Sequence, residues 1–458
     1  MRILVLTPGT GNFYCGSCLR DNSLVHGLRA KGHEGLMVPL YLPLVTDEPP
    51  ENEDAPIFLG GISMFLEQRL PVFRHIPEWL NRILSSPVLL RLAANLAGMT
   101  SARQLGQATV AMLQGKPDRQ AQEVERLVAW LRSQRPPDVI CLSNSLLGGL
   151  TRRLKEEFNV PVVCSLQGED SFLDALPEPY RGQSWDLLAE RCAEVDHFIA
   201  VSQYFGQSMR RRVGLPADKV TVVYPGIAVG DFKPASAPID PPVLAYLARI
   251  HPAKGLETLV AAYVKLKQSN CVPGLRLRVA GAMAGKDSQF ADSMKRRLSP
   301  FLHEVEFLPN LNRARKLEFL RGATVFSVPA TYGEAFGLYV LEACASGVPV
   351  VQPDHAAFPE LLAHTGGGLL CEPNNPTALA QAIQQLLLDP TEARRLGQVG
   401  HRGAQQFTVE VMTQKTEAVL RRAVHAACAD YHFENLCATR RRPAGGGSPR
   451  CGVSARRR

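Results

Sequence analysis

The stretch from Ser327 to Val351, SVPATYGEAFGLYVLEACASGVPVV, predicts a strand, a loop, a helix and a second strand in succession. The β-prone run that ends at Val328 is broken by a proline, and the loop after it has no periodicity. From Leu338 onward the apolar residues recur on one helical face, and Gly347 with the proline that soon follows ends this helix. The stretch is therefore typical of one unit of an α/β sheet.

Two carboxylates stand out in this unit, Glu334 in the loop and Glu342 inside the helix, with seven residues between them. A helix that begins near Gly337 presents free backbone N–H groups and the positive end of its dipole, which suit a phosphate. Carboxylates only accept hydrogen bonds, so two of them around such donors suit a ligand with hydroxyl pairs at both ends and negative charge between. A nucleotide sugar is such a ligand. A buried α/β unit in which Glu342 pairs with a core arginine explains the spacing equally well.

Length and composition indicate a globular protein with two cores, since the chain has 458 residues, of which 45% are hydrophobic and 21% charged. The net charge of +8 is concentrated at the end of the chain, because residues 438–458 hold seven arginines and no acid. This tail has no apolar periodicity, and we expect it to be disordered. A solvated extension explains it better than a contact with RNA or anionic lipid, so we expect no specific nucleic-acid partner.

The first half of the chain predicts a parallel sheet. Residues 3–7, 19–31 and 35–40 have the pattern of a strand, a helix and a strand, and the alternation resumes after Pro136. Strands are expected at 139–142, 162–166, 198–201 and 220–223, with helices at 146–157, 184–194 and 203–213. Between these parts lies an insertion of about 45–135. Its residues 62–100 predict short basic and aromatic helices broken by prolines, which either contact a membrane surface, cap an acceptor pocket or pack on the domain.

A proline-rich segment at 222–242 predicts a domain boundary, after which the pattern restarts with a strand at 243–247, a helix at 256–268 and a strand at 275–280. We therefore expect a first domain over residues 1–230 and a second over 231–405. Residues 406–437 are expected to form a helix that returns to the first domain, followed by the tail. Two doubly wound halves place their ligand cleft at the carboxyl ends of the strands.

The cysteine pattern indicates reduced thiols in a cytoplasmic protein, because eleven cysteines, an odd number, are scattered through apolar runs. Cys15 and Cys18 lack the second pair that a zinc site needs, and small residues at a helix start explain them better than redox chemistry. The first apolar run is too short for a signal peptide, and no 18-residue apolar run predicts a membrane span. The insertion leaves peripheral contact with the inner membrane face open.

The segment GEAFGLYVLEACASGVPVV, residues 333–351, resembles the E-x7-E signature of the family 4 retaining glycosyltransferases, which have the GT-B fold. The resemblance is nearly continuous from 243 to 390. It includes ARIHPAKGLETLVAAY, which is similar to the family's diphosphate-binding stretch, VVYPGIAVGDF, which is similar to its interdomain segment, and FPELLAHTGGGLLCEPNNPTALAQAI, which looks like its last βα segment. The resemblance implies an α/β protein of GT-B type, with two doubly wound Rossmann-like domains that face each other across a cleft.

This family pattern implies a set of site residues in the second half. Arg249 ends a strand and Lys254 precedes a helix, so the two cations can neutralise a diphosphate and the charge that grows as it leaves. Together with Glu334 they are the expected catalytic residues. The expected donor-binding residues are Phe336, Gly337, Leu338 and Glu342, with Pro309 and Asn310 at a strand edge that contacts the base. The chain contains no Asp-x-Asp, so no metal site and no cofactor are expected.

The first half departs from the family pattern. Its first loop, PGTGNFYCGSCLRDN, lacks the paired glycines of many relatives, and Gly11, Gly16 and Asn22 are the expected acceptor-side residues there. After the strand at 162–166, many relatives have a histidine where this chain has Gln167, which cannot titrate. Glu169 and Asp170 follow it. Either can bind or deprotonate the acceptor, and a helix N-cap explains Asp170 equally well.

The resemblance implies a retaining, metal-independent glycosyltransferase that moves a hexose from a UDP-, GDP- or ADP-sugar to a glycan, a lipid-linked acceptor or a small molecule. Three alternatives remain open at this point. They are a nucleotide-sugar-binding protein without transfer, a sugar phosphorylase of the same fold, and an RNA-associated protein that acts through the basic tail.

Overall fold

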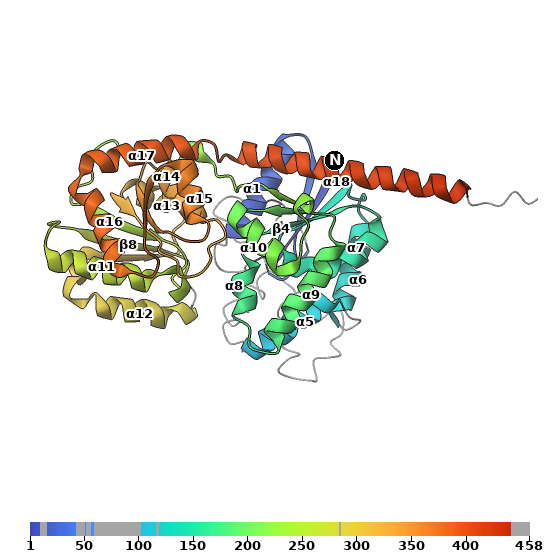
Figure 1. The fold of residues 1–458 in the computed structure, drawn as a ribbon, viewed down its shortest axis with the longest axis horizontal. Coiled ribbons are helices and arrows are strands. Elements are labelled where there is room, and N and C mark those ends of the chain that lie inside the picture. The colour runs from blue at the N-terminus through green and yellow to red at the C-terminus, as the bar shows by residue number, and fades with distance from the viewer. Residues whose placement is uncertain are drawn as a thin grey trace, which may run out of the picture.

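The computed structural model describes residues 1–9, 16–42, 51, 56–58, 102–115, 119–283 and 285–440. These residues form two parallel six-stranded sheets with helices packed on both faces, and each sheet is the centre of one domain (Figure 1). The expected α/β fold of two doubly wound domains is therefore confirmed. The helices expected between residues 62 and 100 lie outside the described residues.

The first sheet has the strand order β2-β1-β3-β4-β5-β6. Its strands are β1 (Arg2–Thr7), β2 (Glu34–Pro39), β3 (Val139–Leu142), β4 (Val162–Leu166), β5 (His197–Ala200) and β6 (Val220–Val222). Every residue of β1, β3 and β4 is buried, because helices cover both faces of the sheet. This double burial explains why the strands appear in the sequence as continuous apolar runs.

The helices of the first domain are α1 (Gly16–Ala30), α5 (Ala102–Gln114), α6 (Arg119–Arg132), α7 (Thr151–Phe158), α8 (Glu169–Asp174), α9 (Tyr180–Glu194) and α10 (Gln203–Val213). Ser202 caps α10 by accepting a hydrogen bond from the N–H of Phe205, and Gly214 ends this helix in a left-handed conformation. These two signals explain why residues 203–213 were predicted to the residue. Helix α1 begins three residues earlier than predicted.

The second sheet has the order β12-β11-β10-β7-β8-β9. Its strands are β7 (Val243–Leu247), β8 (Arg276–Gly281), β9 (Val305–Pro309), β10 (Val325–Phe326), β11 (Val350–Pro353) and β12 (Gly368–Cys371). From β7 the chain continues to β8 and β9 on one side of this strand and then crosses to β10 on its other side. The sheet therefore has a topological switch point between β7 and β10. The first sheet has its own switch point between β1 and β3. Ligands of such sheets bind in the crevice at the carboxyl ends of these strands.

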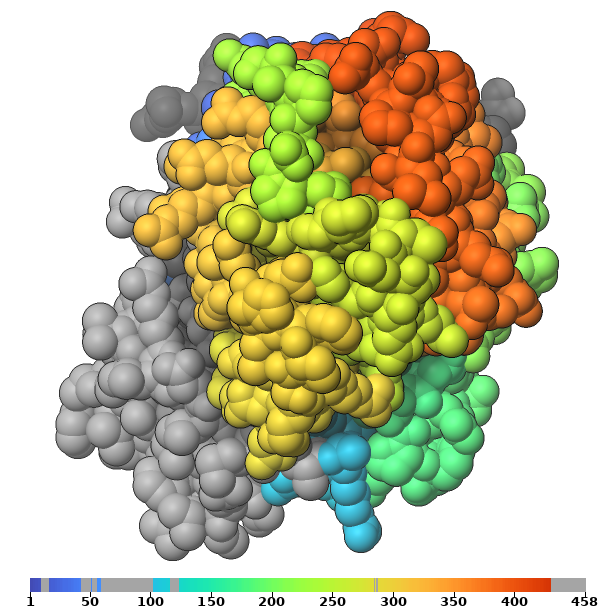
Figure 2. Space-filling view, turned by 90° about the vertical axis from the view of Figure 1, so that its left-hand side faces the viewer, coloured from blue at the N-terminus to red at the C-terminus, as the bar shows by residue number. Residues whose placement is uncertain are grey.

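The helices of the second domain are α11 (Leu256–Ser269), α12 (Ser288–Arg297), α13 (Arg313–Arg321), α14 (Leu338–Ala345), α15 (Phe358–Thr365), α16 (Pro376–Leu388) and α17 (Pro390–Ala404). Figure 2 looks onto this domain, with α11 and α12 in yellow tones beside α16 and α17 in orange and red. The unit predicted from Ser327–Val351 is present as β10, α14 and β11.

The last helix, α18 (Val409–Arg440), leaves the second domain and runs across the first, where it packs against α1 (Figure 1). Its residues Met412, Val419 and Leu420 are buried in one apolar cluster with residues of β1 and α1. The helix extends into the segment that was expected to be a disordered tail, and residues 438–440 are helical. This part of the prediction was wrong, because nothing that ends a helix occurs before Pro443.

Eight cysteines whose side chains the structure describes are free thiols, and six of them are buried. Cys15 lies outside the described residues. Within the part of the chain that the structure describes, no helix is long and apolar enough to cross a membrane.

Candidate active site in the interdomain cleft

A cavity of about 610 Å³ lies between the two domains, at the carboxyl ends of both sheets. It brings together residues that are far apart in the sequence, from α1 and the end of β4 in the first domain to α13 and α14 in the second. The residues expected for the site that line this cavity are Gly16, Gln167, Arg249, Lys254, Glu334, Phe336, Gly337, Leu338 and Glu342.

Glu334 is held at the centre of a hydrogen-bonded group. Its Oε2 accepts hydrogen bonds from Lys254 Nζ at 2.5 Å, Tyr332 Oη at 2.9 Å and Tyr339 Oη at 2.7 Å. Burial raises the pKa of this carboxyl, but the adjacent ammonium of Lys254 and the three hydrogen bonds outweigh burial and hold the pKa below its usual value. Glu334 is therefore ionised at neutral pH, and its Oε1 has no hydrogen bond to a described residue.

Glu342 occupies the second turn of α14 and pairs with Lys316 of α13, whose Nζ lies 2.7 Å from Glu342 Oε1. Both side chains are 12% exposed and both line the cavity. The sequence left open a buried pairing of Glu342 with an arginine. The structure places a lysine in that role and keeps the pair at the cavity wall.

Arg249 follows β7 and points its guanidinium at the buried carboxylate of Asp287, with the closest N–O distance 3.3 Å. The Arg249 side chain is 31% exposed, so it keeps contact with the open part of the cleft. Lys254 lies one residue before Gly255, which precedes α11. Both cations thus lie in the loop that connects β7 to α11 at the carboxyl edge of the second sheet.

The start of α14 faces the start of α1 across the cleft. Gly337 precedes α14 in a left-handed conformation with φ of 91°, which turns the chain sharply after the loop. A Cβ atom added at Gly16 would lie 3.6 Å from Leu338 Cδ1. Two helices thus direct their free N–H groups and positive dipole ends into one space, which favours bound negative charge.

Two donor-side predictions do not reach the cavity. Pro309 ends β9, and Asn310 follows it, where its carboxamide bonds both the N–H and the carbonyl of Met283. Neither residue lines the cavity, whereas the next residue, Leu311, does. Asn310 has a positive φ of 56° that turns its side chain to the neighbouring loop, which is why the strand edge does not present it to the cleft.

The acceptor-side predictions are only partly placed at the cleft. Gly11 lies outside the described residues. Asn22 is buried on α1 and accepts the N–H of Glu51 at 2.8 Å. Because α1 begins earlier than expected, Asn22 lies about 9 Å along the helix axis from Gly16. At that distance from the start of the helix, its side chain does not reach the cavity.

Glu169 and Asp170 do not line the cavity either. Glu169 is 4% exposed and its carboxylate accepts the N–H groups of Ser145, Gln167 and Gly168, so it fixes two loops. Asp170 accepts the N–H of Ser171 inside the first turn of α8, and Gly168 holds the N-cap position. The N-cap role for Asp170 was therefore wrong.

Six further polar residues that sequence reasoning did not single out line the cavity: Ser17, Arg20, Ser171, Lys316, Tyr332 and Tyr339. Tyr332 and Tyr339 lie two and five residues from Glu334 in the sequence, within the stretch Ser327–Val351. This short separation was the signal that could have identified them as site residues. Lys316 has no such signal, because nothing in its own segment indicates that it meets Glu342. No group of three or more His, Cys, Asp or Glu side chains in the described part of the chain could hold a metal ion.

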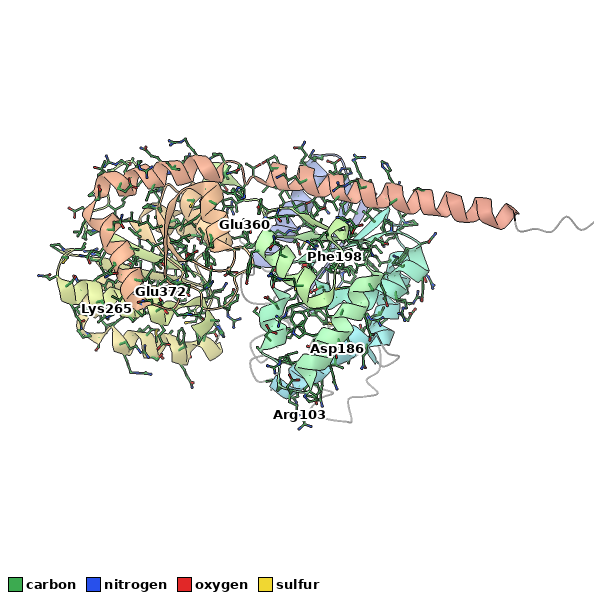
Figure 3. The ribbon with its side chains drawn as sticks, in the orientation of Figure 1. Arg103, Asp186, Phe198, Lys265, Glu360 and Glu372 are labelled. Carbon is green, nitrogen blue, oxygen red and sulfur yellow. The ribbon has the colours of Figure 1, made fainter. Side chains whose placement is uncertain are left out.

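Direct contacts across the cleft hold the domains together on the side of α10. The carboxylate of Glu360 on α15 accepts the N–H groups of Gln203 and Tyr204 at 2.8 and 2.9 Å, and the hydroxyl of Tyr224 at 2.7 Å. Ser202 Oγ donates to the carbonyl of Ala335, next to Glu334. Glu360 lies at the junction of the domains in Figure 3, whereas Phe198 lies within the first one.

Comparisons with known proteins agree with this arrangement. Residues 93–230 match the family model "Glycosyltransferase Family 4", and residues 231–402 match the model "Glycosyl transferases group 1". A D-inositol 3-phosphate glycosyltransferase of Segniliparus rotundus is 30% identical over 243 residues, which are 51% of this chain and 53% of that protein. The chain thus spans about half the length of that curated relative.

Solved structures share the fold over nearly the whole chain. Sucrose-phosphate synthase from Thermosynechococcus elongatus has a TM-score of 0.70 at 19% identity, over 93% of this chain and 100% of that one. Anabaena HepE in complex with UDP-glucose has a TM-score of 0.64 at 19% identity, over 92% and 100%. The fold, the cleft between its halves and the two adjoining family matches place this chain among the glycosyltransferases of the GT-B fold.

Proposed function

We propose that the protein is a retaining, metal-independent hexosyltransferase that uses a nucleotide diphosphate sugar. One observation carries the proposal. An ionised Glu334, locked to Lys254 and two tyrosines, lines an interdomain cavity beside the N-terminus of α14. The complex of HepE with UDP-glucose supports a UDP-sugar as the first donor to test.

The proposed donor lies along the second-domain wall of the cavity. Its diphosphate is placed between Arg249, Lys254 and the N–H groups at the start of α14, which together offset its charge. Glu342, oriented by Lys316, accepts the hydroxyls at the nucleoside end. Glu334 accepts a hexose hydroxyl through Oε1, since its Oε2 is already occupied.

In the proposed reaction the acceptor oxygen attacks the anomeric carbon from the side on which the nucleoside diphosphate departs. The bond between that carbon and the phosphate oxygen breaks, and its electron pair goes to the phosphate. The acceptor's proton passes to the same phosphate. Lys254 and Arg249 stabilise the negative charge that develops, and the configuration at the anomeric carbon is retained.

A thermal-shift screen against UDP-, GDP- and ADP-sugars, followed by an assay of nucleotide release with and without added acceptors, tests the proposal. We expect one nucleotide sugar to raise the melting temperature and to be turned over at the same rate in the presence of a chelator. A shift without nucleotide release would favour a binding protein, and release that requires inorganic phosphate would favour a phosphorylase. Glycans, lipid-linked sugars and small polyols form the acceptor panel.

A further inference from the structure

Arg20 lines the first-domain wall of the cavity, opposite the residues assigned to the donor. Its side chain is only 2% exposed. One end of the guanidinium is fully used, because Nη1 donates to Asp21 Oδ1 at 2.9 Å and to Ser165 Oγ at 2.8 Å. The other edge is different. Its Nε and Nη2 are buried and have no hydrogen-bond partner among the described residues.

Asp21 does not supply the missing partner. Its carboxylate is 1% exposed, does not line the cavity, and already accepts hydrogen bonds from Arg20 Nη1 and Ser143 Oγ, with Thr7 and Gln167 at 3.5 Å. These partners fix Asp21 toward the ends of β1 and β3. The Asp21 side chain therefore balances the charge of Arg20 through Nη1 and leaves the Nε–Nη2 edge without an acceptor group in the described part of the chain.

The chemistry of that group follows from the geometry of a guanidinium. Nε–H and one Nη2–H are parallel donors at the spacing of two oxygens of a phosphate or carboxylate. Buried N–H groups without partners are costly, so such an edge is a sign of a missing acceptor. The first turn of α1 adds to the same preference. Ser17 lines the cavity on the same helical face as Arg20, and the N-terminus of this fifteen-residue helix favours negative charge.

We propose that Arg20 recognises an oxyanion on the acceptor, so that the acceptor class of this enzyme is a phosphorylated or carboxylated molecule. The proposal rests on the proposed function and names the second substrate of the same cleft. The acceptor is favoured over the donor because Arg249, Lys254 and Lys316, the cations assigned to the donor side, all come from the second domain. Arg20 belongs to the first domain. A donor that carries a uronic acid would present a carboxylate of the same chemistry. The experiment therefore distinguishes an oxyanion on the acceptor from one on the donor sugar.

The test uses the full chain saturated with UDP, which occupies the diphosphate region. Isothermal titration then compares glucose 6-phosphate and inorganic phosphate with glucose as the neutral control. We expect glucose 6-phosphate to bind at least tenfold more tightly than glucose. Arg20→Lys keeps the charge beside Asp21 but removes the paired donors, and we expect it to reduce this preference to threefold or less while UDP affinity changes less than twofold.

A second variant separates recognition from a structural role. Asp21→Asn removes the negative charge behind Arg20 and should retain or strengthen the preference for the anion, whereas a purely structural pair predicts equal losses in both variants. Equal binding of the two sugars by the unmodified protein, or an unchanged preference in Arg20→Lys, would overturn the proposal. So would a preference for UDP-glucuronate over UDP-glucose that Arg20→Lys abolishes, because the oxyanion would then belong to the donor. Failure to bind UDP at all would contradict the proposed function itself.

Discussion

At the scale of single residues, Glu334 illustrates how a carboxylate is kept both ionised and oriented in a largely closed site. Lys254 and two tyrosine hydroxyls converge on one of its oxygens, and this leaves the other for substrate. Since the folded-state pKa lies below the ordinary value, this group stabilises the fold above its ordinary pKa. That contribution is lost as the pH falls through the lowered value.

Lys254→Ala should reduce turnover about 10² to 10³-fold, the usual cost of removing one stabiliser of developing charge. Glu342→Ala should lose activity because it removes the proposed acceptor for the nucleoside hydroxyls. We expect both variants to remain folded by circular dichroism. Lys265→Ala, which removes an exposed lysine from the same domain, is the matched control and should be as active as the unmodified protein. Near-normal turnover by either site variant would count strongly against the assigned site.

Tyr339→Phe keeps the ring but removes a hydrogen bond to Glu334 that helps to lower the pKa of this carboxyl. Because hydrogen bonds to charged groups contribute about 1.5–3 kcal/mol, we expect turnover to fall about 10- to 100-fold. The acid limb of the pH–rate profile should move to higher pH. Tyr263→Phe removes a hydroxyl that bonds the Leu275 carbonyl away from the cleft, and its profile should not move. An unshifted acid limb in Tyr339→Phe would rule out this role.

At the scale of elements, the chain uses glycines to bring the site segments into contact. Gly255 precedes α11 with φ of 73°, and an added Cβ would lie 1.7 Å from the carbonyl oxygen of Pro329. The loop that carries Lys254 is therefore pressed against the segment that leads to Glu334. Their hydrogen bond depends on this close approach of two backbones.

Gly255→Ala should be clearly more destabilising than Gly214→Ala. Both glycines have a positive φ near 70°, but the structure places nothing within 4 Å of a Cβ at Gly214. The second variant thus reports the cost of the backbone conformation alone, about 1–2 kcal/mol. Urea denaturation of both variants measures the difference, and we expect Gly255→Ala to lose nucleotide binding as well. Equal destabilisation would show that the close approach costs nothing.

Sequence reasoning recovered most elements because their signals are local. The strands β3, β4 and β7 and the helix α10 have the predicted bounds, since apolar runs, Ser202 and Gly214 mark their ends. Pairings between distant segments were not recoverable. Ser165 meets Arg20 across 145 positions of the chain, and no local pattern carries that information. For this reason the expected acceptor-side residues reach the cavity only in part, whereas the two carboxylates spaced within one short unit both line it.

At the scale of the whole molecule, Glu360 joins the two domains by contacts that lie outside the cavity. Its carboxylate caps the N-terminus of α10 from the opposite domain, where the helix dipole also favours negative charge. The hydroxyl of Tyr224, in the segment that links the two sheets, completes the contact. The arrangement of the domains is therefore stabilised by a group outside the cavity.

Glu360→Gln should weaken this contact without touching the cavity. We expect faster hydrogen exchange at the amides of Gln203 and Tyr204 and a higher KM for the donor, with turnover at saturation reduced less than threefold. Glu372→Gln changes an exposed carboxylate within the second domain and should alter neither. Unchanged exchange at these two amides would contradict the proposed role of Glu360.

Removal of residues 441–458 should leave nucleotide-sugar turnover unchanged, because both sheets and all residues that line the cavity lie before them. A cut after residue 408 should instead lower the melting temperature strongly, since it removes Met412, Val419 and Leu420 from the apolar cluster they share with the first sheet. Loss of activity on the shorter deletion would favour the tail-dependent alternative.

The position of α18 has a consequence for how the chain is made. The strands and helices of the first domain are synthesised early. The helix α18, which covers part of their apolar surface, emerges from the ribosome only at the end of synthesis. The second domain is complete before that point. Nascent chains should thus expose a patch around β1 and α1 through most of translation, which makes them clients for chaperones until the last helix docks.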